Sequence, residues 1–400
     1  MNAAQSHRSR GFSFAIPALM DGCIGLVQTA IPLLALRFGA NALFLGTMGS
    51  MAQGARLPVC MTTGMLSEKI GRTRVIIPAA AMASVACLGL SISRNNLQVL
   101  ALYVVFMISV GAFYPSLQAF IGDRSPRGEL RKNLSAFNVG WTVGGAAFTL
   151  MAGYMFATSE AWPFVAAALL ATGSIYVVRA WSRIPVDPSY SDQQEPITAA
   201  SVMGDVERPR ALLQIARSAH FTGFFGYSAI RSLFPKLGYS IGYSDGTIGL
   251  LLGVMLIGQA AGIFVTSAGP WWRGRLWPLV MALVMGVVSG IGIVFAESRM
   301  MFAAAFLLQG TSLGIAYTQA LYYGLQSRMK MGRNTGIHES LVAAGNISGA
   351  FVGGVVAQYI SLRTPYTALA GLSGAVLVVV GLYWKFGRRQ LNAGSGDRGG

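Results

Sequence analysis

A few ionisable side chains lie inside long apolar segments. Asp21 lies about nine residues into the segment 12–36, and Arg56 about eight residues before the end of the segment 42–63. If these segments are membrane helices, both residues lie roughly 12–13 Å deep at 1.5 Å per residue. A charge at that depth is costly unless it is paired or hydrated. We therefore expect Asp21 and Arg56 to pair between neighbouring helices, and we regard both as candidates for coupling.

This pair has three open interpretations. It could be a permanent ion pair that ties the two helices together, or a pair that a substrate or a proton opens. The two residues could also have separate roles. Each interpretation explains why the chain keeps two charged residues in the membrane, although an isolated charge in hydrocarbon destabilises the fold.

Three further ionisable side chains are candidates. Arg231 lies near the end of the apolar segment 211–233, where its long side chain could extend to the membrane surface. Turned inward, it would be an anion-binding candidate. His338 and Glu339 open the segment 337–360. An acid in a first helical turn is stabilised by the helix dipole, so Glu339 could be a simple cap or, with His338, a coupling group.

Polar side chains in two other segments are candidates for substrate contacts. Tyr114 and Gln118 are four residues apart and therefore share one face of a helix. Gln309, Tyr317 and Gln319 lie in a corresponding segment of the second half. Such donors suit an organic solute with hydroxyl or carbonyl groups, and they serve equally well in hydrogen bonds between helices.

The composition places these residues in a membrane. Of 400 residues, 54% are apolar and only 11% are charged. Apolar runs of about 20 residues recur along the chain, and each can cross about 30 Å of hydrocarbon. We expect twelve helices, at residues 12–36, 42–63, 75–92, 97–121, 133–157, 161–181, 211–233, 246–268, 276–296, 300–324, 337–360 and 366–386. The sequence thus predicts an integral membrane protein surrounded by a lipid bilayer.

The net charge of +16 follows the membrane topology. We assign 22 of the 30 Lys and Arg residues to alternate loops and the termini, which marks that side as cytoplasmic. Both termini are then cytoplasmic, and the predicted location is the cell (inner) membrane. Nucleic-acid binding is not expected, because the basic residues form no folded aqueous face.

The stretch from Gly64 to Arg74 reads Gly-Met-Leu-Ser-Glu-Lys-Ile-Gly-Arg-Thr-Arg between two apolar segments. Its two glycines let the backbone turn. It resembles the G-x-x-x-D-[RK]-x-G-R-[RK] signature of the major facilitator superfamily, found between the second and third membrane helices. Glu68 replaces the usual Asp, and Thr73 interrupts the basic run. The candidate gate residues of this signature stretch are Gly64, Glu68, Lys69, Gly71, Arg72 and Arg74.

An internal repeat supports the resemblance. Six residues recur 203 positions later: Gly39, Gly46, Gly71, Arg72, Gly111 and Tyr114 match Gly242, Gly249, Gly274, Arg275, Gly314 and Tyr317. The predicted fold class is therefore all-α, with twelve transmembrane helices in two pseudo-symmetric six-helix bundles. We expect a tail at 1–11, bundles at 12–182 and 211–386, a cytoplasmic linker at 183–210 and a second tail at 387–400.

The resemblance also implies which helices move. In this superfamily helices 2 and 11, and helices 5 and 8, form the seams between the bundles. Small residues at four-residue spacing lie in these helices, and they could allow rocking or only close packing: Gly46, Ser50 and Gly54; Gly140 and Gly144; Gly249 and Gly253; Gly345, Gly349 and Gly353. The resemblance further implies that Glu68 approaches the start of helix 11 in one conformation, which would make Glu68, His338 and Glu339 a gate.

The function that the resemblance implies is secondary active transport of a small solute by alternating access, driven by a proton or solute gradient. Helix 4 has no Arg at 105–111 and helix 5 no Pro at 144–149, which weakens the alternative of a drug:proton antiporter. A transporter-like receptor or scaffold is the alternative from another class. The chain has no G-x-x-x-x-G-K-[ST] phosphate loop. We expect no enzyme activity, no cofactor, no metal site and a monomer.

Overall fold

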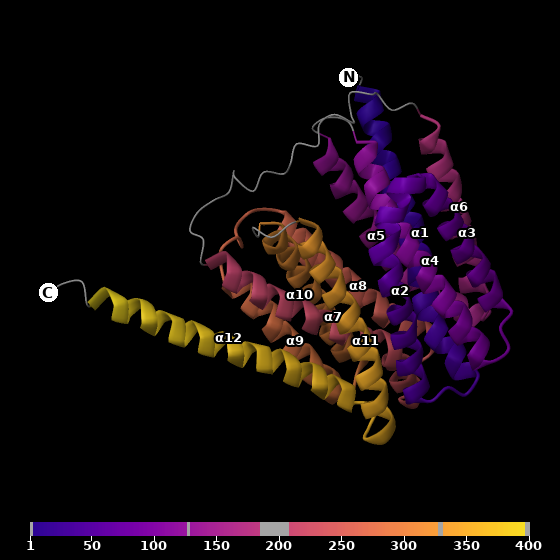
Figure 1. The fold of residues 1–400 in the computed structure, drawn as a ribbon. Coiled ribbons are helices and arrows are strands. Elements are labelled where there is room, and N and C mark those ends of the chain that lie inside the picture. The colour runs from indigo at the N-terminus through magenta and orange to yellow at the C-terminus, as the bar shows by residue number, and fades with distance from the viewer. Residues whose placement is uncertain (1–2, 126–128, 185–207, 327–330, 397–400) are drawn as a thin grey trace.

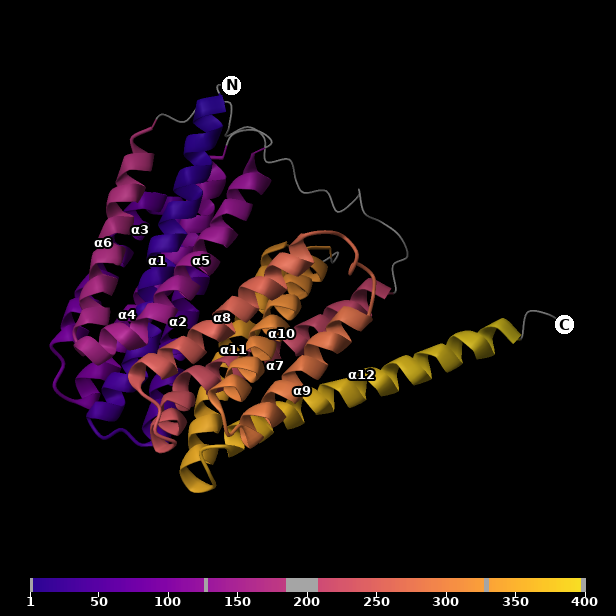
Figure 2. The same cartoon turned by 180° about the vertical axis from the view of Figure 1, so that it is seen from behind.

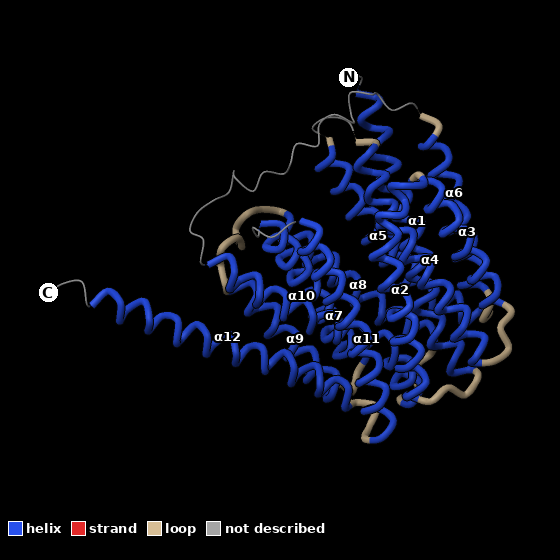
Figure 3. The backbone as a smooth tube through the Cα atoms, in the orientation of Figure 1, coloured by secondary structure: helices blue, strands red, loops and turns tan. Residues whose placement is uncertain are grey.

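The computed structural model describes residues 3–125, 129–184, 208–326 and 331–396, and every regular element within these ranges is an α-helix (Figure 3). The described helices are α1 (Ala3–Arg37), α2 (Ala42–Ile70), α3 (Arg72–Ser91), α4 (Asn96–Asp123), α5 (Leu130–Thr158), α6 (Trp162–Ser182), α7 (Arg208–Ser240), α8 (Asp245–Ser267), α9 (Trp277–Phe295), α10 (Arg299–Gln326), α11 (Met331–Tyr359) and α12 (Thr364–Gly396). The all-α fold class is confirmed.

Several helix ends differ from the expected ones. α1 already begins at Ala3 and α12 continues to Gly396, so helix extends into both predicted tails. The start of α11 at Met331 precedes the predicted start. Most of the predicted linker, residues 185–207, lies outside the described residues.

Ten of the helices are long and apolar enough to cross a membrane over the described residues; α2 and α7 are not among them. The two exceptions carry polar side chains in mid-helix, Gln53 and Arg56 in α2 and His220 and Arg231 in α7. These side chains lower the mean hydropathy of their helices. Their placement in the structure, described below, explains why a membrane protein tolerates them.

The helices form two bundles, α1–α6 and α7–α12, which diverge from each other like the arms of a V (Figures 1 and 2). The bundles meet at the end where α1 stops and α8 begins, and they part toward the end where α1 begins. We call the end where α1 begins the terminal side and the other end the opposite side. The inter-bundle packing is dominated by α2 against α11 and α5 against α8, as the resemblance implies.

Backbone conformation supports the pseudo-symmetry. The glycines with positive φ among the described residues are Gly39 (78°), Gly71 (103°), Gly242 (82°) and Gly274 (67°). They form two repeat-equivalent pairs, 203 residues apart, at equivalent turns. Residues with a Cβ rarely adopt this region, so these positions favour glycine.

Some of the glycines in the stripes lie in the seams between the bundles, and others lie between helices of one bundle. A Cβ on Gly46 would lie 2.4 Å from the Ala350 carbonyl oxygen, and a Cβ on Gly249 would lie 2.6 Å from the Gly153 nitrogen, so these glycines lie in the α2–α11 and α5–α8 seams. Gly253 also faces Leu150 across the α5–α8 seam, whereas Gly140 and Gly144 face α1 and Gly345 and Gly349 face α7, each within one bundle. Gly54 has no neighbour within 4 Å of its Cβ position.

Candidate functional site

A cavity of about 750 Å³ lies between the bundles, on the terminal side of their contact. Eight helices line it: α1, α2, α4 and α5 from one bundle and α7, α8, α10 and α11 from the other. Its polar lining includes Asp21, Gln28, Gln53, Arg56, Tyr114, Gln118, Trp141, Tyr227, Arg231, Gln259, Tyr317, Glu339 and Asn346. The volume suits a small organic solute.

Asp21 and Arg56 face this cavity together, but they do not form the expected ion pair. No salt bridge within 4.0 Å joins them in the described part of the chain. Instead the Tyr114 hydroxyl donates a hydrogen bond to the Asp21 carboxylate. The backbone and side chain of Arg56 pack against Gly111 of α4. A phenol therefore satisfies the carboxylate, and the guanidinium group is left within electrostatic range of both Asp21 and Glu339.

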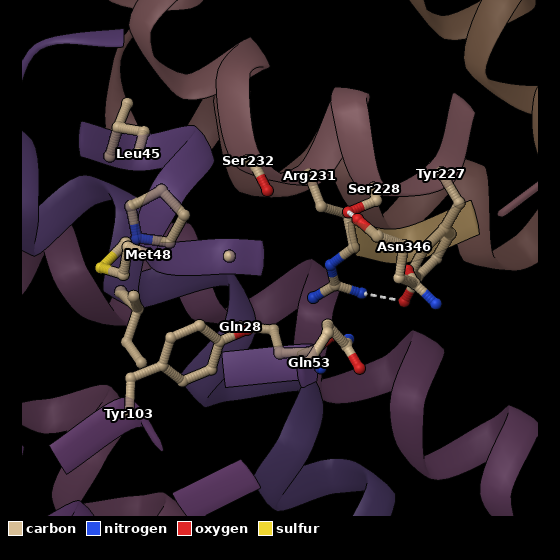
Figure 4. A pocket seen from close by; sticks show the side chains of 13 residues that line it. Gln28, Leu45, Met48, Gln53, Tyr103, Tyr227, Ser228, Arg231, Ser232 and Asn346 are labelled. Carbon is tan, nitrogen blue, oxygen red and sulfur yellow. Dashed lines mark hydrogen bonds between the residues drawn. The ribbon is translucent and has the colours of Figure 1, made fainter. Parts of the chain in front are cut away.

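Arg231 is turned inward. Arg231 is only 6% exposed, so its side chain does not extend to the membrane surface. It lines the deep end of the cavity and also a small pocket of about 30 Å³ beyond it (Figure 4). This pocket lies next to the contact between α2 and α7, where Gly49 meets Ser232.

His338 and Glu339 are not in the first turn of α11. The helix begins at Met331, and the dipole effect fades within one turn, so the capping interpretation is wrong. Glu339 lines the cavity. His338 is buried and stacks on His220 of α7 with ring centroids 4.4 Å apart. The ring of Tyr317 lies edge-on to His338 at 5.3 Å.

The substrate candidates divide into two groups. Tyr114, Gln118 and Tyr317 line the cavity. Gln309 does not, because its amide donates to the Gly223 carbonyl oxygen at 3.0 Å inside the second bundle. Gln319 is fully buried and outside the lining; two residues after Tyr317, it points to nearly the opposite face of α10.

The signature stretch holds one bundle together in this conformation. α2 stays helical through Gly64 to Ile70, so only Gly71 makes the turn that two glycines were expected to share. Arg72 forms an ion pair with Asp123 at 2.9 Å and donates to the Ser67 hydroxyl and the Gly64 carbonyl. The exposed Arg74 donates to the Ile70 carbonyl. Glu68 and Lys69 are exposed. A meeting of Glu68 with α11 stays a prediction for another conformation.

On the opposite side the cavity is closed by polar contacts between the bundles. Arg37 forms an ion pair with Asp245 at 3.0 Å, and Asp245 also accepts from the Tyr239 hydroxyl. Lys236 donates to the Ala40 carbonyl at 3.3 Å, and the Gln358 side chain accepts from a backbone amide of α2 at 3.2 Å.

Several cavity residues were not predicted, although the repeat contained a signal for them. Gln28 and Arg231 are 203 residues apart, as are Arg56 and Gln259, and all four line the cavity. Gly111 and Gly314 pack against Arg56 and Gln259 in the same way, which confirms the equivalence. Extending the repeat to polar residues would have identified Gln28 and Gln259. The positions are symmetric, whereas the charges are not.

Comparisons with known proteins agree with this architecture. The sequence profile of the Major Facilitator Superfamily matches residues 14–323, and a second, overlapping match covers residues 217–399. The gentisate transporter of Corynebacterium glutamicum is 23% identical over 67% of the chain, and the match spans 61% of that transporter's length. The enterobactin exporter EntS of Salmonella typhi is 22% identical over 90% of the chain and 87% of its own length.

A solved structure shares the fold. A bacterial homologue of the human lysosomal transporter Spinster, in an inward-facing and occupied conformation, superposes with a TM-score of 0.69. The superposition covers 97% of this chain and 98% of that one at 15% sequence identity. At this identity the likeness concerns the fold alone.

Proposed function

Because the chain belongs to the Major Facilitator Superfamily, we propose that its two bundles rock about the closed seam and carry a small solute across the membrane by alternating access. The observation that carries this proposal is the 750 Å³ cavity, which lies between the bundles and ends at a polar contact layer. Secondary transporters of this repeat architecture bind their substrates between the repeats near the midplane.

The terminal side is the cytoplasmic side in this proposal, and the membrane is the inner membrane. Two observations support it: the excess of Lys and Arg in the loops of that side, and the likeness to a transporter whose structure is described as inward-facing. Both chain ends would then be cytoplasmic, and the protein would work as a monomer.

A proton or solute gradient drives the movement in this proposal. Asp21 is the candidate coupling group, because it is a carboxylate that faces the cavity and is held by a hydroxyl rather than by a cation. The relatives do not share one substrate: one is named for gentisate and another exports enterobactin. The substrate is therefore argued from the cavity itself, below.

Currents recorded on a solid-supported membrane test the proposal. Proteoliposomes would be exposed to sugars, amino acids, organic acids and cationic drugs, with and without a pH gradient. We expect a solute-dependent current that the Asp21→Asn variant loses. If no solute gives a current and no radiolabelled solute shows counterflow, the proposed transport function is contradicted.

A further inference from the structure

Hydroxyl groups hold the guanidinium group of Arg231. Among the described residues no Asp or Glu oxygen lies within 4.0 Å of its guanidinium group. Nη1 donates to the Tyr227 hydroxyl at 2.9 Å, and Nη2 donates to the Thr29 hydroxyl at 3.3 Å, while the buried Nε has no acceptor. Hydroxyl groups satisfy donors, but they do not neutralise a buried positive charge.

The cavity's carboxylates lie at a different level. Asp21 precedes Thr29 by eight residues on α1, which is about 12 Å along a helix axis. Glu339 precedes Asn346, a neighbour of Arg231 in the small pocket, by seven residues on α11, or about 10 Å. The deep end of the cavity is therefore positive, and its negative groups lie nearer the terminal side.

The groups around Arg231 suit a carboxylate. Figure 4 shows its guanidinium group turned toward the amide side chains of Gln28 and Gln53, which come from the other bundle. Among the described residues the buried carbonyl oxygen of Gln53 has no hydrogen-bond partner. Amides can donate to an anion beside an arginine.

The cavity wall above Arg231 is aromatic. Phe137, Trp141, Phe224, Tyr227 and Tyr317 all line it, from both bundles. Trp141 and Tyr317 meet edge to face across the gap with ring centroids 6.3 Å apart. Such rings favour a flat, apolar ligand body.

From these contacts, and on the basis of the proposed function, we propose that the transported solute is a small aromatic monocarboxylate whose carboxylate binds Arg231 at the deep end of the cavity. The carboxylate takes the guanidinium edge formed by Nε and Nη2 and displaces Thr29, while Nη1 keeps its bond to Tyr227. An arginine edge binds a carboxylate with two parallel hydrogen bonds.

One negative charge on the solute matches the deep end of the cavity, where Arg231 lies. Asp21, Arg56, Arg231 and Glu339 are the ionisable acids and bases that line it, and they carry two charges of each sign when all are ionised. Arg56 lies within electrostatic range of both acids, which leaves Arg231 as the cation that an anion neutralises. Displacing Thr29 also removes a hydrogen bond between the bundles, so binding weakens the contact that must open next.

Binding to the full-length protein in nanodiscs tests this proposal. The probes are benzoate, 2-naphthoate and indole-3-acetate, each with its uncharged primary amide, and sodium chloride and inorganic phosphate as small anions. The readouts are thermal stability and the fluorescence of the tryptophans, one of which lines the cavity. We expect at least one acid to bind, and its amide to bind at least tenfold more weakly.

Variants locate the binding. Arg231→Gln should weaken the acid at least tenfold, and Arg231→Lys should give an intermediate loss, because lysine keeps the charge but lacks the fork. Arg94→Gln, which removes an exposed cation on the opposite side, should bind as the unchanged protein does. If Arg231→Gln does not fold, the comparison of each acid with its amide still tests the proposal, because it uses the unchanged protein.

Four results would overturn the proposal: no acid binds, an amide binds as tightly as its acid, Arg231→Gln binds as well as the unchanged protein, or chloride and phosphate compete at the affinity of the acids. Transport of a neutral or cationic solute in the current assay would then leave the proposed function standing. Absence of all transport, with acid binding intact, would contradict the proposed function instead.

Discussion

On the opposite side the two bundles touch through glycine backbones and an ion pair, whereas on the terminal side the same bundles enclose a cavity. Gly46 lies against Ala350 and Gly354, and Arg37 bonds Asp245. Within the described residues, one hydrogen bond between the bundles joins Arg231 to Thr29. The others lie in helix halves and turns nearer the opposite side. Buried apolar side chains of both bundles also belong to one continuous cluster, with Leu45 of α2 and Leu233 of α7 among its members. The contrast teaches that the closure combines close glycine backbones, polar contacts and apolar packing, whereas on the terminal side the described residues of the two bundles face a cavity.

The first way to break this contrast is to fill the seam. In the Gly46→Ala variant, a Cβ would lie 2.4 Å from the Ala350 oxygen and 2.7 Å from the Gly354 Cα. Backbone atoms cannot rotate away, so the bundles must separate there. We expect solute transport to fall by an order of magnitude or more, measured as current or uptake.

The matched control for the seam lies on the same helix. The Gly54→Ala variant adds the same methyl group where nothing lies within 4 Å. Its stability should stay within ~1 kcal/mol of the unchanged protein, in the favourable direction for a helix, and it should transport normally. Normal transport by Gly46→Ala would contradict the claim that transport requires close contact of the backbones at Gly46.

The second way is to remove the ion pair. The Asp245→Asn variant loses a buried carboxylate that Arg37 and Tyr239 hold. Because Arg37 is itself about half exposed, with 48% of its side-chain surface accessible, we expect the closed state to lose about 1–3 kcal/mol, or a 5–150-fold shift in population. The measurement is the rate at which a Ser232→Cys variant reacts with an impermeant maleimide added from the opposite side.

Glu160→Gln provides the comparison for this pair. Glu160 contacts the same Arg37 at 3.4 Å but is 50% exposed, so its loss should cost less than ~1 kcal/mol. Equal losses in the two variants would show that the ion pair of Arg37 with Asp245 stabilises the closed state no more than the exposed pair with Glu160 does.

The sequence predicted the fold well because membrane helices and repeats leave strong patterns. The glycines at 39, 71, 242 and 274, which the repeat pairs at one displacement, all have positive φ, so the repeat in the sequence is also a repeat in the backbone. Rotation of each helix about its own axis was harder to predict. Gln319 was expected in the cavity and lies behind α10, because uniformly apolar spans do not indicate which face is inward.

The candidate site was predicted in part for a related reason. Depth along a helix follows from residue counting, so Asp21 and Arg56 were expected at a common level, and both line the cavity. Choice of partner depends on side chains from a third helix, and Tyr114 of α4 takes the carboxylate that Arg56 was expected to hold. The start of α11 was missed because residues 331–336 contain two glycines and three polar residues, a composition typical of a loop.

The third prediction concerns the terminal side of the contrast. The Tyr114→Phe variant removes the hydroxyl that donates to Asp21 and leaves a half-buried carboxylate without that bond. We expect a loss of about 1–3 kcal/mol in the free energy of unfolding, measured by denaturation in mixed micelles. The Tyr176→Phe control, on a side chain that is 67% exposed, should change nothing. A Tyr114→Phe variant as stable as the unchanged protein would contradict the hydrogen bond from Tyr114 to Asp21.

The smallest expected effect lies in the signature stretch. The Asp123→Asn variant breaks an ion pair with Arg72 in which the acid is 52% exposed, so it should cost less than ~1 kcal/mol and weaken as salt is added. The Arg72→Gln variant should cost more, because it also removes the bonds to Ser67 and Gly64. The reverse order, measured by the same denaturation, would contradict a stabilising role for the bonds from Arg72 to Ser67 and Gly64.

The measurement that tests the account most directly is accessibility from the two sides of the membrane. Thr142 lines the cavity and Ser232 the small pocket beyond Arg231. Each would be changed to Cys in a chain without Cys23, Cys60 and Cys87, and labelled from either side with an impermeant maleimide. Alternating access predicts that a transported solute shifts the two rates in opposite directions, with Thr142→Cys labelled from the terminal side and Ser232→Cys from the opposite side. Rates that rise or fall together, or a Ser232→Cys variant that never reacts from the opposite side, would contradict it.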